Sequence, residues 1–122
     1  MGYHSVDPDD IEPFEASGRD FRPIGRAIGL ETLGLNHVTV PPGEQIPLQY
    51  HFHEDQEEAF YVIDGTLHVE TPEREYVLES GELFVAEPES PHRAYNPQRA
   101  ATSVTVLAVG APAVDDARPY EG

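Results

Sequence analysis

The sequence predicts an all-β fold, a small barrel or jelly roll, and two observations support this prediction. Twelve prolines and ten glycines divide the 122 residues into short segments. About eight of these segments have the residue pattern of a strand, and none has the stripe of an amphipathic helix. A chain of this length can enclose one core, so we expect one domain. It consists of an N-terminal arm over residues 1–28, a barrel over residues 29–110 and a C-terminal tail over residues 111–122.

The segment before the barrel is polar and acidic. Its sizeable apolar side chains up to residue 20 are Val6, Ile11 and Phe14, which predicts an arm with one short edge strand. Residues Phe21–Ile28 predict either a helical turn or an irregular approach to the barrel. The first barrel strand is then expected at Gly29–Val40.

Turn residues separate the barrel strands. Pro41-Pro42-Gly43 ends the first strand, because proline fixes φ and glycine accepts a positive φ. Asp64-Gly65 predicts a two-residue hairpin turn, and the strand before it is apolar on both faces, which predicts complete burial. The other strands are expected at Ile46–His53, Glu57–Ile63, Thr66–Thr71, Glu75–Leu78, Glu82–Ala86, His92–Asn96 and Ser103–Val109.

The stretch His51-Phe52-His53 carries the main chemical signal. In a strand, side chains at i and i+2 leave the same face about 6.5 to 7 Å apart, so both imidazoles can face one point. Glu58 shares a face with Phe60 and Val62 on the next strand, and if the two strands pair, Glu58 falls opposite the histidines. Two imidazoles and one carboxylate suit a divalent first-row metal and leave coordination positions open.

The surroundings of this stretch resemble the first conserved motif of the cupin superfamily. The motif reads Gly43, seven residues, His51-x-His53, four residues, Glu58, six residues, Gly65. The superfamily pattern has the same order of residues, with about five residues in its first gap.

A second segment resembles the other cupin motif. It reads Gly81, five residues, Glu87, one residue, Glu89, two residues, His92, three residues, Asn96. The spacing fits the superfamily throughout. Glu87 and Glu89 stand where the superfamily usually has Pro and Gly, and Pro88 and Pro91 can form the turn instead.

The resemblance implies a double-stranded β-helix, the jelly-roll barrel of cupins, with one divalent transition-metal ion: Fe, Mn, Zn, Ni, Co or Cu. The implied ligands are His51, His53, Glu58 and His92. Glu57 is the alternative carboxylate ligand, since a gap of three residues also occurs in the superfamily. Glu58 is preferred, because it keeps the six-residue spacing to Gly65.

Other side chains are expected near the metal or in the pocket; they are Gln49, Phe60, Tyr95 and Asn96. No motif supports His4, His37 or His68 as a ligand. Cupin-like chains often pair through an N-terminal arm, so the resemblance also implies a homodimer.

The composition restricts the partners. There is no cysteine, which leaves histidine and carboxylate as the strong metal ligands. Twenty-three acidic residues and seven arginines, with no lysine, give a net charge of -16. Such a surface repels nucleic acid and anionic membranes, and it resembles proteins of salt-accumulating halophilic archaea. We expect the melting temperature to fall as KCl is lowered from about 2 M to about 0.1 M.

The sequence also gives expectations for the cellular location and the activity of the protein. No apolar run approaches the roughly 18 residues of a membrane helix, and the N-terminus has no signal-peptide pattern, so we expect a soluble cytoplasmic protein. The leading hypothesis is a metal-dependent protein that binds or converts a small oxygen-rich metabolite, for example a dioxygenase or an isomerase. A non-catalytic sensor or store and a structural cupin with an empty pocket are the alternatives.

Overall fold

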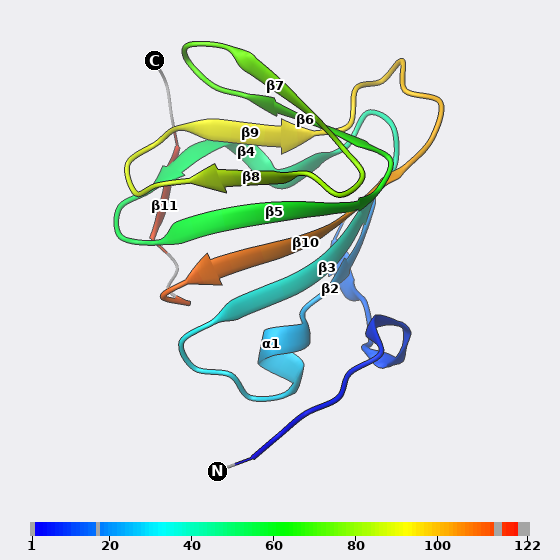
Figure 1. Cartoon of the computed structure of the whole chain (residues 1–122), viewed down its shortest axis with the longest axis vertical. Helices are drawn as coiled ribbons and strands as arrows, with labels where there is room; N and C mark the ends of the chain where they lie inside the picture. The colour runs from blue at the N-terminus through cyan, green and yellow to red at the C-terminus, as the bar shows by residue number, and fades with distance from the viewer. Residues whose placement is uncertain (1, 17, 114–115, 120–122) are drawn as a thin grey trace.

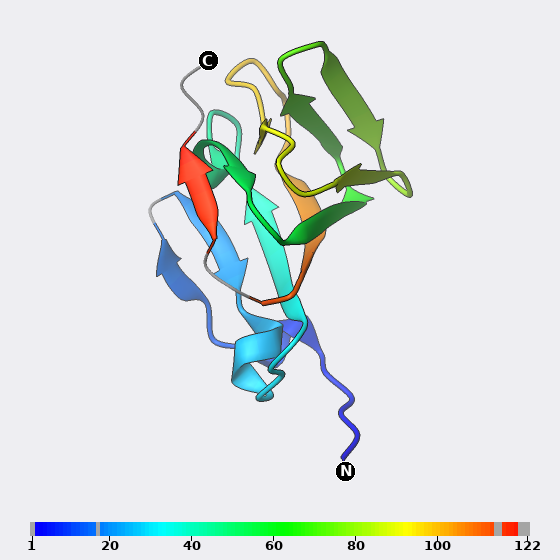
Figure 2. The ribbon, with the colours of Figure 1, turned by 90° about the vertical axis from the view of Figure 1, so that its left-hand side faces the viewer.

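The structure is a computed structural model that describes residues 2–16, 18–113 and 116–119, without the side chains of residues 15, 16 and 47–50. Two antiparallel sheets face each other, which confirms the predicted all-β jelly roll (Figures 1 and 2). The first sheet has the order β1-β2-β3-β10-β5-β8 and the second has the order β11-β4-β9-β6-β7.

Most strands lie within a few residues of their predicted positions. The elements are η1 (Pro8–Asp10), β1 (Phe14–Ala16), β2 (Arg19–Arg22), α1 (Ile24–Ala27), β3 (Gly34–Val40), β4 (Gln45–His53), β5 (Glu57–Asp64), β6 (Thr66–Glu70), β7 (Glu75–Glu79), β8 (Leu83–Ala86), β9 (His92–Tyr95), β10 (Val104–Ala111) and β11 (Ala117–Pro119). In the described part of the chain, no helix has the length and hydropathy to span a bilayer.

The core lies between the two sheets and follows from the alternation of side chains along each strand. In β10 every second residue is buried, beginning with Val104 and Val106, which have no exposed surface. The same period places Val38 and Val40 of β3 inside the barrel. The core therefore joins residues from both sheets, and burial of these apolar side chains is the main force that closes the barrel.

Both ends of the chain add strands to this barrel. β1 and β2 form a hairpin at the edge of the first sheet, where β2 pairs with β3, and α1 lies beside β3 (Figure 1). The segment expected as a polar tail contributes β11, whose Ala117 and Pro119 lie opposite His53 and His51 of β4. β11 thus covers backbone groups of β4 that would otherwise form a bare sheet edge.

The hairpin predicted at Asp64-Gly65 is wrong. β5 belongs to the first sheet and β6 to the second, so the chain crosses between sheets at this point. Gly65 has a φ of 90°, and a Cβ there would lie 2.7 Å from the carbonyl oxygen of Ser103. The dipeptide indicated the positive φ correctly, but the closure of the barrel decides which strands pair.

The complete burial predicted for β5 is also wrong. Phe60 and Val62 are fully buried, whereas Tyr61 and Ile63 are each 44% exposed on the outer face. Within the part of the chain that the structure describes, no further layer covers Tyr61 and Ile63, so an apolar outer face does not imply burial here.

Candidate metal centre

Strands β4 and β9 bring two histidines face to face. His51 of β4 is directly opposite His92 of β9 in the register, and each has 1% exposed surface. His53 lies two residues after His51, so the pleat directs it to the same face. The Nε2 atoms of His51 and His53 are 3.0 Å apart. Two adjacent strands of the second sheet therefore supply three imidazoles to one point inside the barrel.

Glu58 reaches the histidines from the other sheet. The expected pairing of its strand with the His51 strand is wrong, because β5 lies in the first sheet and β4 in the second. The Oε1 atom of Glu58 is 2.7 Å from Nε2 of His92, 3.7 Å from Nε2 of His51 and 3.6 Å from Nε2 of His53. The carboxylate thus closes the cluster across the barrel interior.

The spacing of these atoms fits a set of metal ligands. Ligand atoms of His51, Glu58 and His92 all lie within 4.8 Å of one another. His53 is not one of these three, but its Nε2 lies 3.0 Å from Nε2 of His51 and 3.6 Å from Oε1 of Glu58. At metal–ligand bonds of about 2.0 to 2.2 Å, ligand atoms at right angles are about 3 Å apart. The donor set of imidazole nitrogen and carboxylate oxygen suits a divalent transition metal.

Asp116 orients His53, and no sequence motif indicates this role. The Oδ1 atom of Asp116 is 2.9 Å from Nδ1 of His53, and its Oδ2 accepts hydrogen bonds from the backbone N–H groups of Asp55 and Gln56. An Nδ1–H that donates to Asp116 leaves the Nε2 lone pair of His53 directed at the cluster. Asp116 lies outside both motifs and is positioned only because β11 pairs with β4.

Backbone and aromatic groups orient His92. Its Nδ1 is 2.8 Å from the carbonyl oxygen of Ser90, so an Nδ1–H donated there leaves the Nε2 lone pair facing Glu58. The rings of Phe60 and Phe84 lie 6.1 and 6.0 Å from the imidazole, centroid to centroid. These apolar walls limit the access of water and strengthen the electrostatic interactions inside the cluster.

The electrostatics of the cluster favour an ionised carboxylate. Burial opposes the charge on Glu58, but interactions with His51, His53 and His92 outweigh it and hold the pKa of this carboxyl below its usual range. The pKa of His53 is raised, mainly by Glu58 and further by Asp116, against the effect of burial. The site therefore presents a negative charge to whatever binds between the imidazoles.

The remaining predicted site residues lie in different surroundings. Glu57 is exposed, so the structure brings Glu58 and not Glu57 to the histidines. The Tyr95 hydroxyl donates to Glu75, and the ring of Tyr95 lies near His68, away from the cluster. Asn96 is buried, but it donates to the carbonyl oxygens of Val40 and Thr102.

Gln49 was also expected near the metal, and its side chain lies outside the described residues. Phe60 is the predicted pocket residue that does contact the cluster, through the ring of His92.

A pocket of about 550 Å³ adjoins His92. It is lined in part by residues of β7 and β8, each of which is an edge strand of its sheet. Its wall includes Tyr76 and Phe84 together with the carboxylates Glu87 and Glu89. A small molecule in this pocket would lie beside one of the candidate metal ligands.

Comparison with known proteins agrees with this geometry. The model of the cupin domain family matches residues 36–109, more than half of the chain, and this segment includes all four candidate ligands. A search of curated proteins finds no match.

Solved structures share the fold. A proposed sugar phosphate isomerase from Acidithiobacillus ferrooxidans has a TM-score of 0.69 and 24% identity over 76% of this chain, which spans 58% of that protein. A sugar phosphate isomerase of the cupin superfamily from Silicibacter pomeroyi has a TM-score of 0.77 and 26% identity over 88% of this chain and 75% of that one. The polyketide cyclase RemF from Streptomyces resistomycificus has a TM-score of 0.80 and 19% identity, with coverages of 99% and 87%.

Proposed function

This chain belongs to the cupin domain family, and we propose that it binds one divalent transition-metal ion through His51, His53, Glu58 and His92. We further propose that the metal centre binds and converts a small, oxygen-rich metabolite. The similar structures include two described as sugar phosphate isomerases and one polyketide cyclase, and the sugar phosphates and polyketides in these names are oxygen-rich molecules. The proposal takes from them this general substrate class and no particular reaction.

One observation carries the proposal: three imidazole nitrogens converge on a single carboxylate oxygen at 2.7 to 3.7 Å inside the barrel. Two of the imidazoles have their other nitrogen bound, His53 to Asp116 and His92 to Ser90. Buried polar groups normally have partners that satisfy them. Here the imidazole nitrogens and the carboxylate oxygen face one another, an arrangement that is stabilised by a proton between them or by a bound cation in its place.

The residues of the chain have distinct roles in this mechanism. Glu58 contributes the negative charge that offsets part of the charge of a divalent ion, and the histidines contribute neutral donors. Asp116 and Ser90 fix the rings of His53 and His92, so little reorganisation is needed on binding. When bound, a divalent metal supplies Lewis-acid chemistry that polarises a carbonyl or hydroxyl group.

The pocket beside His92 then decides which molecules reach the centre. Phe84 and Tyr76 offer apolar contact, whereas Glu87 and Glu89 repel anions at the entrance. A neutral polyhydroxylated or keto-hydroxy compound fits these walls better than an acid does. Vicinal oxygens would allow such a compound to chelate a metal held by the four residues.

Elemental analysis of protein purified without chelators tests the proposal. We expect close to one equivalent of a single transition metal, and loss of that metal in both His51→Ala and His92→Ala. His68→Ala is the matched control, because His68 pairs with Glu75 on the outer face and lies away from the cluster. Wild-type protein that binds no divalent ion at neutral pH would disprove the proposal.

Catalysis needs a separate test. Metal-loaded and metal-free protein should be incubated with a panel of neutral sugars, hydroxyketones and polyphenols, and the consumption of each compound followed by mass spectrometry. Metal-dependent conversion of a panel member supports an enzyme. Metal-dependent binding without conversion favours the non-catalytic alternative.

A further inference from the structure

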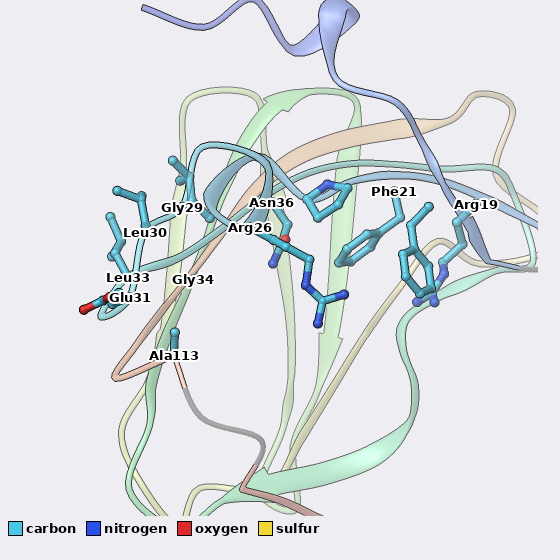
Figure 3. Close-up of a pocket in the computed structure, with 13 residues that line it drawn as sticks. Arg19, Phe21, Arg26, Gly29, Leu30, Glu31, Leu33, Gly34, Asn36 and Ala113 are labelled. Carbon is cyan, nitrogen blue, oxygen red and sulfur yellow. The ribbon is translucent and has the colours of Figure 1, made fainter. Parts of the chain in front are cut away.

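A second pocket, of about 600 Å³, lies where α1, β2 and β3 meet (Figure 3). Its lining joins apolar side chains, among them Phe14, Phe21 and Leu35, with the guanidinium groups of Arg19 and Arg26. None of the four candidate metal ligands lines it. Figure 3 shows Arg19 and Arg26 pointing to the same side, with the ring of Phe21 between them in that view.

The two arginines differ in their partners from three other arginines of the chain. Arg22, Arg93 and Arg118 each form an ion pair with a carboxylate. Arg19 and Arg26 have no carboxylate within 4.0 Å in the part of the chain that the structure describes, although the sequence has 23 acidic residues. Glu31 also lines the pocket, but its carboxylate lies at the far end from Arg26 in Figure 3. The pocket therefore brings together two guanidinium groups that form no ion pair among the described residues, and Glu44 acts on Arg19 only from farther away.

Arg19 is also incompletely hydrogen-bonded. Its Nη1 donates to the carbonyl oxygen of Gln45 at 3.1 Å, whereas its Nε is buried and has no partner among the described residues. Burial lowers the pKa of this guanidinium, and Glu44 partly opposes the effect. A buried donor without an acceptor is unfavourable, so Arg19 is held in the pocket wall with part of its hydrogen-bonding capacity unused.

The wall of this pocket and Glu58 of the metal cluster lie on nearby strands of the first sheet. Gly34 in the pocket wall pairs with Gly110 of β10, which in turn pairs with Glu58 of β5. The amide of Gln56 lies over Gly110, only 2.7 Å from the position that a Cβ would occupy, and donates to the carbonyl oxygen of Pro112. The pocket and the cluster are therefore neighbouring but separate sites.

We propose that this pocket binds a small organic anion, in which a carboxylate or phosphate group is attached to an apolar body. Arg26 and Arg19 hold the anionic group, and Phe21 and Leu35 pack against the body. Arginine suits this role because its planar guanidinium forms paired hydrogen bonds to such oxygens and stacks on flat apolar groups. The inference is independent of the metal centre and goes beyond the function proposed above.

Calorimetric titration of the full chain tests the inference, with benzoate and phenyl phosphate as probes and benzamide as the neutral analogue. We expect both anions to bind with a Kd at least about tenfold below that of benzamide, because charge-assisted hydrogen bonds are lost in the amide. Arg26→Gln and Arg19→Gln should each weaken anion binding by about tenfold. The tighter of the two anions identifies the preferred group.

Matched variants distinguish binding in this pocket from non-specific attraction to arginine and from binding at the metal centre. Arg74→Gln should leave anion binding unchanged, since Arg74 lies over the ring of Tyr76 outside the pocket. The His51→Ala/His92→Ala double variant should also retain it. Arg26 is exposed, so its substitution tests the site even if Arg19→Gln fails to fold. Equal affinity for benzamide, unchanged binding in Arg26→Gln, or loss of binding in the histidine double variant would each overturn the inference.

Discussion

Asn96 and the cluster around Glu58 are both buried polar sites in one barrel, but their partners differ. Asn96 donates to two backbone carbonyl oxygens, those of Val40 and Thr102, so the fold itself satisfies it. Glu58 faces three imidazoles whose nitrogens also face one another. The difference shows how a structural polar residue is distinguished from a ligand. The first has backbone partners, and the second has partners that would all share one cation.

The largest expected effect is the loss of metal from Glu58→Gln. The amide keeps the shape of the carboxylate but removes the negative charge, so we expect metal affinity to fall at least about 100-fold. Glu57→Gln is the matched control, because Glu57 is adjacent and exposed, and its affinity should stay within about twofold of wild type. Competition with a chromophoric chelator measures both values. The reverse pattern would make Glu57 the ligand.

Asn96→Ala should lower the stability of the fold and leave metal binding unchanged, whereas Glu58→Gln should weaken metal binding. The carbonyl oxygens of Val40 and Thr102, in one buried and one part-buried hydrogen bond, lose their donor, so we expect the free energy of unfolding to fall by about 2 kcal/mol. Metal content per folded molecule should stay near that of wild type, since the contacts of Asn96 lie outside the cluster. Urea denaturation and elemental analysis give the two values. If folded Asn96→Ala protein loses its metal, Asn96 is not a purely structural residue, and the contrast with the Glu58 cluster fails.

A smaller effect is expected at Asp116, which acts on the cluster only through His53. Asp116→Asn should weaken metal binding by about tenfold at neutral pH, as is usual when a histidine ligand loses its carboxylate partner. Glu54→Gln is the control, because Glu54 pairs with Arg118 on the surface. Titration with the metal at one pH measures the metal affinity of both variants.

The same variant has a predicted pH signature. Asp116 contributes to the raised pKa of His53, and a proton on His53 competes with the metal. Wild-type affinity should therefore fall as the pH decreases through that raised pKa. In Asp116→Asn the pKa of His53 drops, so the decline should begin at a lower pH. An unchanged pH profile would show that Asp116 does not act through the imidazole.

The sequence predicted the local features of this molecule better than its long-range pairings. Strand positions and the shared face of His51 and His53 depend on alternation along a few residues, which a sequence shows directly. The approach of Glu58 from the opposite sheet and the docking of Asp116 through β11 depend on how the barrel closes. No local pattern encodes that closure. The arginine pocket was missed for the same reason, since α1, β2 and β3 meet only in the folded chain.

The smallest effect concerns the loop that delivers His92. Glu89 has a φ of 67°, the single positive value among the described non-glycine residues, and it stands where the cupin motif usually has Gly. Its backbone N–H donates to the carbonyl oxygen of His53 at 2.6 Å, which ties the loop to β4. A side chain in this conformation is strained, so Glu89→Gly should raise the free energy of unfolding by about 1 kcal/mol.

Glu87→Gly is the matched control for this substitution. Glu87 lies in the same loop without a positive φ, so glycine there mainly increases the entropy of the unfolded chain and should destabilise the fold by about 0.5 to 1 kcal/mol. Thermal denaturation of the two variants should therefore give shifts of opposite sign. If both variants lose stability, the Glu89 side chain contributes more than its backbone strain costs.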